Sequence, residues 1–408
     1  MLRAHKIRLS PTFGQEQWLL QACGVARFCY NWGLAEWQRQ YEVGGKPSAY
    51  ALKKQLNAIK RQAFLWMYDV TKCAVDTGFR NLDAAFKNFF RRCKNGDTKK
   101  GYPRFKSRKR SKKSFRMDGS RVKLNGHWIK LEKLDGLINM AEPLRFGGEV
   151  KSVTISESAG RWYIAINVER ELPEHKHPQE SVGVDLGVKT LAVLSDGREF
   201  ENQKLLRSEL RKLKRLNQEL SRRQKGSGRW WRTKDKLTKL HRKIANRRLD
   251  YQHKISTQIA STYRVIGVED LNVAGLLKNH CLALSLADAG FGEIQRQLGY
   301  KAEWYGGLLV EIDRFFPSSK LCRHCGCTNT DLTLADREWI CDCGAVLNRD
   351  SNAAINIETE ALRIVADVGS QRRKTRVESD IRPIAETSAA SMKRENMVEE
   401  RRPSRLAI

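Results

Sequence analysis

The sequence contains no run that approaches the roughly 18 consecutive apolar residues of a membrane-spanning helix. It also lacks the apolar core of a signal peptide near its start, where Met1 to Lys6 lead into a short strand pattern. These absences argue against a membrane or secreted protein, so we expect a cytoplasmic one. The 408 residues, 40% of them hydrophobic, are enough for two to four domains with buried cores.

Acidic residues are scarce relative to basic ones. Asp and Glu number 46 against 76 Lys and Arg, which gives a net charge of +30. This excess predicts a polyanionic partner that is bound through its phosphates and released by salt. An anionic membrane is the competing polyanion, but the lack of a spanning run argues against it. We therefore expect nucleic acid as the partner and no membrane.

The cysteines are unevenly distributed. The sequence contains ten, and five of them crowd into one short segment: Cys322, Cys325, Cys327, Cys341 and Cys343. This clustering in a chain without a secretion signal favours metal binding over disulfides. Two cysteine pairs with nearby glycines, Cys322 with Cys325 and Cys341 with Cys343, predict one tetrahedral Zn²⁺ ribbon over residues 317–345. Because the second pair is separated by one residue instead of the usual two, Cys327 or His324 could replace a ligand.

The first 172 residues contain two kinds of pattern. Residues 1–12 and 96–172 carry short alternating runs separated by turn residues, which predict the strands of a small β-barrel. Residues 13–95 interrupt them with apolar residues at helical spacing, so we predict a helical insert. Its aromatic side chains could stack on nucleic-acid bases. A stripe at this spacing is more typical of a buried core, and we favour that interpretation.

A dense basic segment lies between the helical insert and the barrel strands. Its charge and its glycine and proline content oppose burial, which predicts a surface loop or strand edge. Aromatic residues interleaved with the cations favour phosphate contact with base stacking over a merely solvated charge run. The candidate nucleic-acid-binding residues are Lys99, Lys100, Tyr102, Arg104, Phe105, Lys106, Arg108, Lys109 and Arg110.

One carboxylate lies inside an apolar run. Residues 182–194 are typical of a strand, a glycine-eased bend and a second strand, followed by an Asp-Gly turn, and Asp185 lies in the first strand. Desolvating a lone carboxylate costs several kcal/mol, so this side chain needs a compensating partner. A metal ion and a buried Lys or Arg are equally good candidates.

Two further apolar strands, at residues 263–271 and 308–313, end in carboxylates. Together with the helical stretch between them they predict a parallel α/β core, in which ligands bind at the carboxyl edge of the strands. A basic helical hairpin over about 206–248 could be only a soluble surface, but its excess of one charge favours a nucleic-acid cradle. Residues 367–408 are poor in apolar side chains, so we expect disorder there.

Three carboxylates stand on separate elements of this α/β core: Asp185, Glu269 and Asp350. Asp350 precedes a helix and could also be a plain N-cap. Acidic groups that converge in a polyanion-binding protein make electrostatic sense if divalent metals bridge them to phosphate. Two Mg²⁺ ions would fit, one activating water and the other stabilising the leaving oxygen of a phosphodiester. The carboxylates that compete for these roles are Asp196, Asp270 and Asp313.

Four segments in fixed order resemble the TnpB family of transposon-encoded, RNA-guided nucleases, relatives of the type V CRISPR effectors. They are Gly183–Gly187, Val268–Leu271, the cysteine ribbon and Asn348–Ile357, and the resemblance covers residues 1 to about 365. It implies a multidomain α+β and α/β protein. An RNase H-like (RuvC) nuclease domain would span 179–316 and 346–366, with the ribbon as an insert. The barrel would be a wedge domain, and residues 13–95 its helical recognition insert.

The resemblance also implies roles and partners. Asp185, Glu269 and Asp350 would be the catalytic, Mg²⁺-binding residues. A guide RNA derived from the transposon end would supply sequence specificity by pairing, while the protein reads a short target-adjacent motif. We therefore expect an RNA-guided, Mg²⁺-dependent DNA endonuclease that acts as a monomer on double-stranded and single-stranded DNA.

Two other functions compete with this interpretation. A guide-dependent DNA-binding protein without cleavage would gain nothing from three carboxylates facing phosphate. A DNA strand-transfer transposase would use similar acidic metal chemistry. It should carry an end-binding module such as a helix-turn-helix, and the sequence reveals none to us.

Overall fold

The computed structural model describes residues 1–171, 174–333 and 336–380. The chain divides into two compact units, an N-terminal one of Met1–Pro173 with Leu213–Lys243 and a C-terminal one of Glu174–Lys212 with Ile244–Ile408. This division differs from the expected one, because part of the basic helical hairpin groups with the N-terminal unit instead of with the domain that we began at residue 179.

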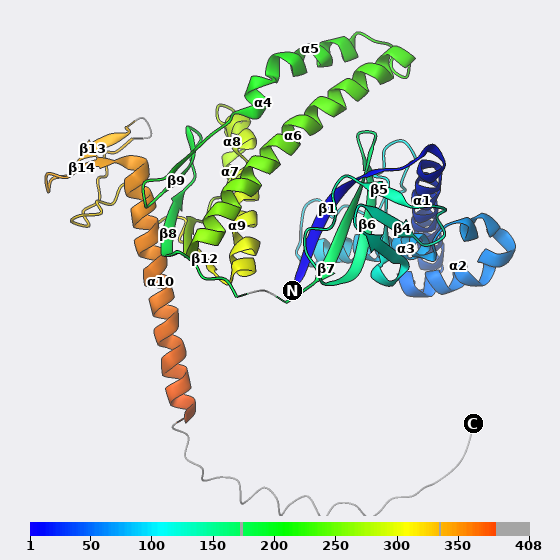
Figure 1. The fold of residues 1–408 in the computed structure, drawn as a ribbon, viewed down its shortest axis with the longest axis horizontal. Coiled ribbons are helices and arrows are strands. Elements are labelled where there is room, and N and C mark those ends of the chain that lie inside the picture. Colours follow the sequence, from blue (N-terminus) through cyan, green and yellow to red (C-terminus); the bar gives the residue numbers. More distant parts are fainter. Residues whose placement is uncertain (172–173, 334–335, 381–408) are drawn as a thin grey trace, which may run out of the picture. The chain divides into compact units, whose positions relative to one another are not determined.

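Three helices follow the first strand of the N-terminal unit (Figure 1). They are α1 (Phe13–Glu42), α2 (Ala49–Ala63) and α3 (Lys72–Lys94), and the short 3-10 helix η1 (Leu65–Asp69) precedes α3. α1 begins with a capping box, in which the Thr12 hydroxyl accepts from the Gln15 backbone N–H and the Gln15 side chain accepts from the Thr12 N–H at 3.0 Å. These helices occupy the segment where we predicted a helical insert.

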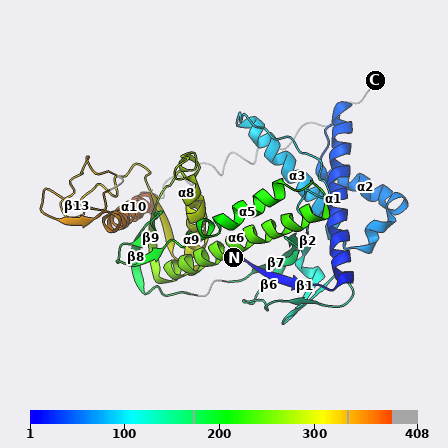
Figure 2. The ribbon, with the colours of Figure 1, turned by 90° about the horizontal axis from the view of Figure 1, so that it is seen from above.

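Seven strands of the same unit form a nearly closed antiparallel sheet (Figures 1 and 2). Its hydrogen-bonded order is β2-β6-β7-β1-β5-β4-β3, so the first strand of the chain pairs with strands that follow the helices. The strands are β1 (Leu2–Ser10), β2 (Ser114–Asp118), β3 (Val122–Asn125), β4 (Trp128–Leu131), β5 (Ile138–Met140), β6 (Glu149–Ser158) and β7 (Arg161–Glu169). The short 3-10 helix η2 (Gly119–Arg121) joins β2 to β3.

The aromatic stripe of the helices packs mainly into the core of this unit. Trp18 and Phe86 are buried, and the Trp37 ring stacks on Phe86 with a centroid distance of 3.8 Å. Trp18 meets Phe115 of β2 edge to face at 6.1 Å. The core interpretation of the stripe is therefore confirmed for these side chains. Tyr41 is an exception, because 72% of it is exposed.

The C-terminal unit contains a five-stranded sheet of order β10-β9-β8-β11-β12. The strands are β8 (Gln179–Asp185), β9 (Thr190–Leu194), β10 (Glu199–Glu201), β11 (Tyr263–Glu269) and β12 (Leu308–Ile312). β8, β11 and β12 run parallel, whereas β9 is antiparallel to β8 and β10 to β9. The predicted parallel core, with its first strand folded back into a hairpin, is therefore present.

Helices lie between and after these strands along the chain. They are α4 (Leu205–Ser208), α5 (Leu210–Ser221), α6 (Gly228–Thr262), α7 (Val273–Leu276), α8 (Ala283–Ala289), α9 (Phe291–Tyr305) and α10 (Arg349–Asp380). Two of them, α9 and α10, pack on the sheet. α5 and α6 run side by side in both ribbon views (Figures 1 and 2). α10 runs to Asp380 and so includes the first residues of the tail where we expected disorder, and this stretch contains Arg, Lys and Glu, which are good helix formers. Residues 381–408 lie outside the described residues.

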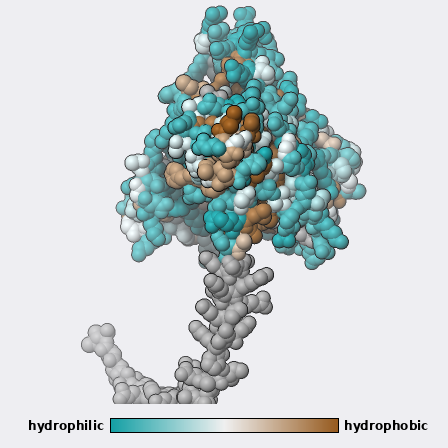
Figure 3. Space-filling view, turned by 90° about the vertical axis from the view of Figure 1, so that its left-hand side faces the viewer, coloured by the Kyte–Doolittle hydropathy of each residue, from teal (hydrophilic) through white to brown (hydrophobic). Residues whose placement is uncertain are grey.

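A small hairpin of β13 (Glu338–Ile340) and β14 (Val346–Asn348) precedes α10. Figure 3 views the molecule from this side and shows a mainly hydrophilic surface with some hydrophobic residues gathered near its centre. Ile340 and Val346, which pair across the hairpin, are 70% and 69% exposed. Within the described ranges, no helix is long and apolar enough to cross a membrane.

Candidate functional site

Two of the candidate carboxylates end neighbouring parallel strands. Val184 of β8 pairs in register with Val268 of β11, and the next residues along the two strands are Asp185 and Glu269. Because parallel strands end at the same edge of a sheet, both side chains lie at its carboxyl edge. Asp185 and Glu269 therefore meet as we predicted from the strand pattern.

Helix α10 brings the third carboxylate to this edge. Asp350 lies in its first turn, while Asn348 caps the helix by accepting from the Ser351 N–H at 3.1 Å. The alternative that Asp350 is a plain N-cap is therefore wrong. α10 packs closely on the sheet at Gly183, where an added Cβ would collide with the carbonyl of Ala354.

The three carboxylates influence one another electrostatically. Burial raises the pKa of Asp185 most strongly, and the charges of Glu269 and Asp350 raise it further, to about 7, although Arg349 and Arg337 act in the opposite direction. Within the described part of the chain, no hydrogen bond or ion pair is formed by the Asp185 carboxylate. The alternative of a buried Lys or Arg paired with Asp185 is therefore not supported.

Each of the other two carboxylates has one neutralising or orienting partner. Arg337 Nη1 donates to both oxygens of Asp350, at 3.2 and 3.1 Å. The Ser318 hydroxyl donates to Glu269 Oε1, and the Gln295 amide donates to the Glu269 backbone carbonyl at 2.7 Å. Oxygen-rich clusters of this kind suit hard divalent cations such as Mg²⁺. Asp185 in particular would gain from a cation, because none of the described residues forms an ion pair with it.

The competing carboxylates are engaged elsewhere. Asp196 accepts from Arg198 Nε at 2.7 Å and from the Tyr263 hydroxyl. Asp270 pairs with Arg314 at 2.5 Å. The Asp313 carboxylate accepts from the Phe315 backbone N–H at 2.8 Å. Among the described residues, Glu269 and Asp350 are the carboxylates whose charges act on Asp185, and none of these three competitors does so, which favours Asp185, Glu269 and Asp350 over them.

The four predicted zinc ligands converge. The sulfur atoms of Cys322, Cys325, Cys341 and Cys343 all lie within 4.8 Å of one another. Among the Cys, His, Asp and Glu side chains of the described residues, these four cysteines form a group that could together hold a metal ion. Neither Cys327 nor His324 belongs to this group. A tetrahedral thiolate site is the arrangement that structural Zn²⁺ prefers, so the donor set fits that ion.

Backbone turns explain how the shortened second pair still reaches the other sulfurs. The Gly326 N–H donates to the Cys322 carbonyl at 2.9 Å, and the Gly344 N–H donates to the Cys341 carbonyl at 2.8 Å. Both glycines have positive φ, 75° and 84°, a conformation that glycine adopts without steric cost. The two turns place Cys343 Sγ 3.8 Å from Cys322 Sγ.

Hydrogen bonds connect the segment that holds the cysteine cluster to the carboxylates, and they involve residues that we did not predict from the sequence. Arg337 borders the hairpin, and its carbonyl accepts from the Arg349 N–H at 2.8 Å, next to Asp350. On α10, the amides of Asn352 and Asn356 both donate to the Leu321 carbonyl at 2.7 Å, beside the first cysteine. The spacing of four between the two asparagines on a helix could have predicted this contact, but no local pattern marks Arg337.

The predicted nucleic-acid-binding segment is partly packed. Tyr102 lies edge-on to Phe86 and Phe89, with centroid distances of 5.8 and 5.2 Å, so one part of its ring belongs to the helical core. The Lys106 ammonium lies 4.0 Å from the Tyr30 ring centroid. Tyr102 nevertheless remains 43% exposed. The other side chains of the segment are also exposed, namely Lys99, Lys100, Arg104, Phe105, Arg108, Lys109 and Arg110.

Three family models match the chain. Residues 163–280 match OrfB_IS605, described as a probable transposase, and residues 291–357 match the TNB domain of Cas12f1-like proteins. Residues 1–46 match a model described as a helix-turn-helix domain. The sequence patterns marked no such module, and this match is one of sequence similarity. In the structure residues 1–46 contain β1 and one long helix, α1, so the described residues of this segment do not form the pair of helices of a helix-turn-helix.

Relatives cover most of the chain. A protein of Streptomyces pristinaespiralis, provisionally named an RNA-guided DNA endonuclease, is 36% identical over 365 residues, which are 87% of this chain and 88% of that protein. InsQ of Escherichia coli (strain K12), with the same provisional name, is 34% identical over 87% of this chain and 91% of its own. A Cas12f1–sgRNA–target DNA complex matches with a TM-score of 0.54 at 13% identity, over 88% of this chain and 98% of that chain, which shows a shared fold. The chain belongs to the TnpB family.

Proposed function

We propose that the protein is a transposon-encoded, RNA-guided DNA endonuclease that cleaves its target at Asp185, Glu269 and Asp350. The observation that carries this proposal is the meeting of three carboxylates at one sheet edge of a protein with a net charge of +30. Burial, together with the charges of Glu269 and Asp350, raises the pKa of Asp185 to about 7. A site of this kind is unfavourable until a divalent cation binds it.

The three carboxylates would hold two Mg²⁺ ions. When bound, such ions supply an activated water and stabilise the leaving oxygen in phosphodiester hydrolysis. Asp185 and Glu269 are fixed by their strands, and Asp350 is fixed by the packing of α10. Ser318 and Gln295 orient Glu269, so the chain itself determines where the oxygen ligands lie.

The cysteine cluster would hold one structural Zn²⁺. Its donor set supports this assignment, because four sulfur atoms lie within 4.8 Å of one another. The ion would stabilise the ribbon over residues 317–345, which carries Arg337 and Ser318 to the carboxylates.

The partners would be a guide RNA from the transposon end and double-stranded and single-stranded DNA. The guide would pair with its target next to a short target-adjacent motif, while the basic segment from Lys99 to Arg110 would contact phosphates. In this proposal a monomer suffices. Residues 1–12 and 96–172 would form the wedge domain, 13–95 the recognition insert, and 179–316 with 346–366 the nuclease domain.

The proposal is tested by expressing the protein with its flanking transposon sequence and sequencing the RNA that co-purifies. The particle is then given Mg²⁺ and a plasmid library that carries the matching target beside randomised flanks. A discrete RNA and cleavage next to one flanking motif would support the proposal. Target binding without cleavage would favour a guided binding protein instead, and the absence of bound RNA would contradict the proposal.

A DNA strand-transfer transposase is a second candidate, because the matching family models are described as a probable transposase and a helix-turn-helix domain. The two functions differ in their products. A transposase joins a transposon end to the target strand, whereas an endonuclease releases ends that stay unjoined. To distinguish the two functions, the reaction is run with a labelled transposon end and its DNA products are sequenced for junctions between that end and the target.

A further inference from the structure

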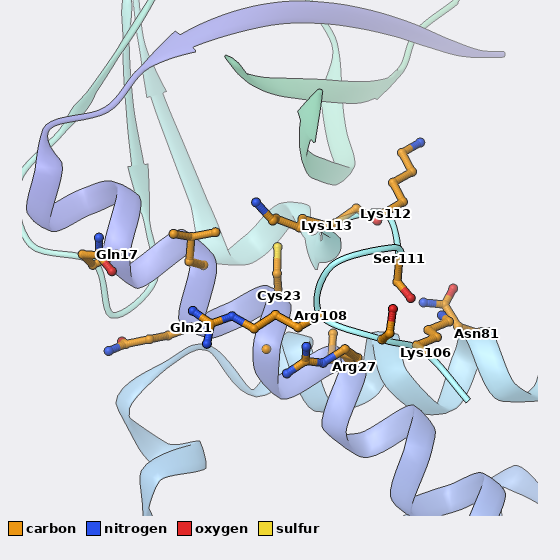
Figure 4. Close-up of a pocket in the computed structure, with 15 residues that line it drawn as sticks. Gln17, Gln21, Cys23, Arg27, Asn81, Lys106, Arg108, Ser111, Lys112 and Lys113 are labelled. Carbon is orange, nitrogen blue, oxygen red and sulfur yellow. The ribbon is translucent and has the colours of Figure 1, made fainter. Parts of the chain in front are cut away.

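The N-terminal unit contains a cavity of about 520 Å³ that the proposed cleavage site does not use (Figure 4). Helix α1 forms one wall, and the chain from Lys106 to Ser114 curves over it as the other. Asn81 of α3 also lines the cavity, which is partly open to solvent. Its volume falls within the range of about 300–1,000 Å³ that is typical of ligand sites.

The loop wall is held in place at both ends. The Asn31 side chain of α1 donates to the Lys106 carbonyl at 2.9 Å and accepts from the Lys106 N–H at 2.8 Å. At the other end, the Lys113 carbonyl accepts from the Glu157 N–H at 3.0 Å, where β2 joins β6. The cavity is therefore a preformed feature of the fold rather than a gap beneath a free loop.

The lining is strongly cationic. Among the described residues it contains no acidic side chain, whereas its cations are Arg27, Lys106, Arg108, Lys112 and Lys113. Lys113 is partly neutralised by Glu157 at 3.4 Å, and burial lowers the pKa of Lys106. Neither Arg27 nor Arg108 has an acidic partner in the described ranges, so both guanidinium groups can bind a phosphate.

The remaining lining suits a nucleobase. Leu20, Cys23, Gly24 and Ala26 make an apolar floor on α1. The amides of Gln17, Gln21 and Asn81 offer both donors and acceptors, which match the edge of a base. An added Cβ on Gly24 would meet nothing within 4 Å, so this position leaves space for a flat ring.

We propose that this cavity binds one unstacked nucleotide of the guide RNA, with its phosphate at Arg27 and Arg108 and its base on the floor at Gly24. A duplex cannot enter a cavity of this size. In guided recognition the target strand is paired with the guide and only the displaced DNA strand is single, whereas RNA is commonly recognised through individual bases that are splayed out of single-stranded loops. The identity of the nucleic acid rests on the proposed function, but the site itself rests on the cavity.

Two variants test the two halves of the site. Gly24→Leu fills the floor without changing charge, and the double variant Arg27→Gln/Arg108→Gln removes the phosphate-binding guanidinium groups. The matched charge control is Lys123→Gln/Lys278→Gln, because both lysines are exposed and lie outside the cavity. Gly24→Ala and thermal melting control for folding. The probe is the RNA that co-purifies with the wild-type protein. For each variant we would measure the affinity for this RNA, the salt dependence of that affinity, and the protection of single nucleotides in chemical footprinting.

We expect the arginine double variant to bind this RNA at least tenfold more weakly than the control, with a salt slope reduced by about 0.7 for each phosphate that is no longer neutralised. Gly24→Leu should expose one nucleotide that the wild type protects, at unchanged slope. If the wild type binds the RNA and all variants give the same footprint and the same salt slope, the inference about the cavity is overturned and the proposed function is not. A protected nucleotide in target DNA instead of RNA would also overturn it. Failure of the wild type to bind any RNA would contradict the proposed function itself.

Discussion

Gly183 and Gly267 lie directly opposite each other on the neighbouring parallel strands β8 and β11, and helix α10 packs on both. An added Cβ at Gly267 would lie 2.8 Å from Ala361 Cβ, and one at Gly183 would collide with the Ala354 carbonyl. The two glycines allow α10 to pack so closely that its first turn delivers Asp350 to Asp185 and Glu269. The carboxylate site therefore depends on two residues that have no side chain.

Replacing Gly183 by alanine should displace α10 and separate Asp350 from the strand carboxylates. We expect a loss of stability of about 1–3 kcal/mol, as for other overpacked sites, and a large loss of metal-dependent cleavage. Denaturant unfolding and a cleavage assay measure the two effects. Gly299→Ala is the matched control, because its Cβ would lie at an ordinary 3.6 Å from Leu309. Equal behaviour of the two variants would contradict the role of the glycine pair.

Asp185→Asn should stabilise the metal-free protein at neutral pH. The pKa of Asp185 is raised from the usual 3.8 to about 7, so the folded state retains a proton that the unfolded state loses between these values. Its contribution to stability therefore decreases as pH rises from about 4 to 7 and is then constant, with an upper limit of about 4 kcal/mol at about 1.4 kcal/mol per unit.

Melting temperatures from pH 4 to 8, recorded in a chelator, measure this effect. The gain from Asp185→Asn should be small at pH 4 and largest above pH 7, and Mg²⁺ should stabilise the wild type more than the variant. Asp235→Asn removes an exposed carboxylate from an i,i+4 pair with Lys239 and should change little. A gain in melting temperature that is independent of pH would contradict the conclusion that the Asp185 carboxylate is strained in the cluster.

Arg337→Ala should increase the affinity of the carboxylate site for divalent cations. The guanidinium competes for both oxygens of Asp350, at 3.2 and 3.1 Å. Its removal leaves the cluster more negative, and we expect tighter binding by about threefold to tenfold, or roughly 1 kcal/mol. Titration with Mn²⁺ as a paramagnetic probe measures the affinity, with Arg296→Ala on α9 as a control outside the site. Unchanged or weaker binding would show that Arg337 does not compete with the metal.

Cys343→Ser should remove zinc, whereas Cys327→Ser should leave it bound. Only the first residue belongs to the group of four sulfurs, although both lie in the same short segment. Loss of a ligand loosens the ribbon that carries Arg337 and Ser318, so cleavage should also fall. Elemental analysis of the purified variants gives the zinc content. Stoichiometric zinc in Cys343→Ser, or its loss in Cys327→Ser, would contradict the assigned ligand set.

Much of the fold and of the carboxylate site could be predicted, because these features depend on residue patterns that are local in the sequence. Apolar, β-branched runs that end in acidic residues marked β8 and β11, and their parallel pairing then places Asp185 beside Glu269. The cysteine pairs were equally local. Asp350 was harder to place, because its position depends on how α10 packs across two strands.

The remaining features depend on contacts between distant residues. Ser318 reaches Glu269 only once the ribbon has folded against α10, and Arg337 reaches Asp350 only through the hairpin. Spacing does not encode such contacts. The cavity beneath Lys106 is also tertiary, since the basic segment was recognisable as a surface loop but its attachment to Asn31 was not.

The most direct test of the central claim is single-turnover cleavage of a matched DNA target by the RNA-bound protein in Mg²⁺. The wild type is compared with Asp185→Ala, Glu269→Ala and Asp350→Ala, and with Asp196→Ala as a nearby carboxylate outside the cluster. We predict that each cluster variant binds RNA and target normally but fails to cleave, while Asp196→Ala still cleaves. Cleavage at the wild-type rate by any of the three cluster variants would contradict the account.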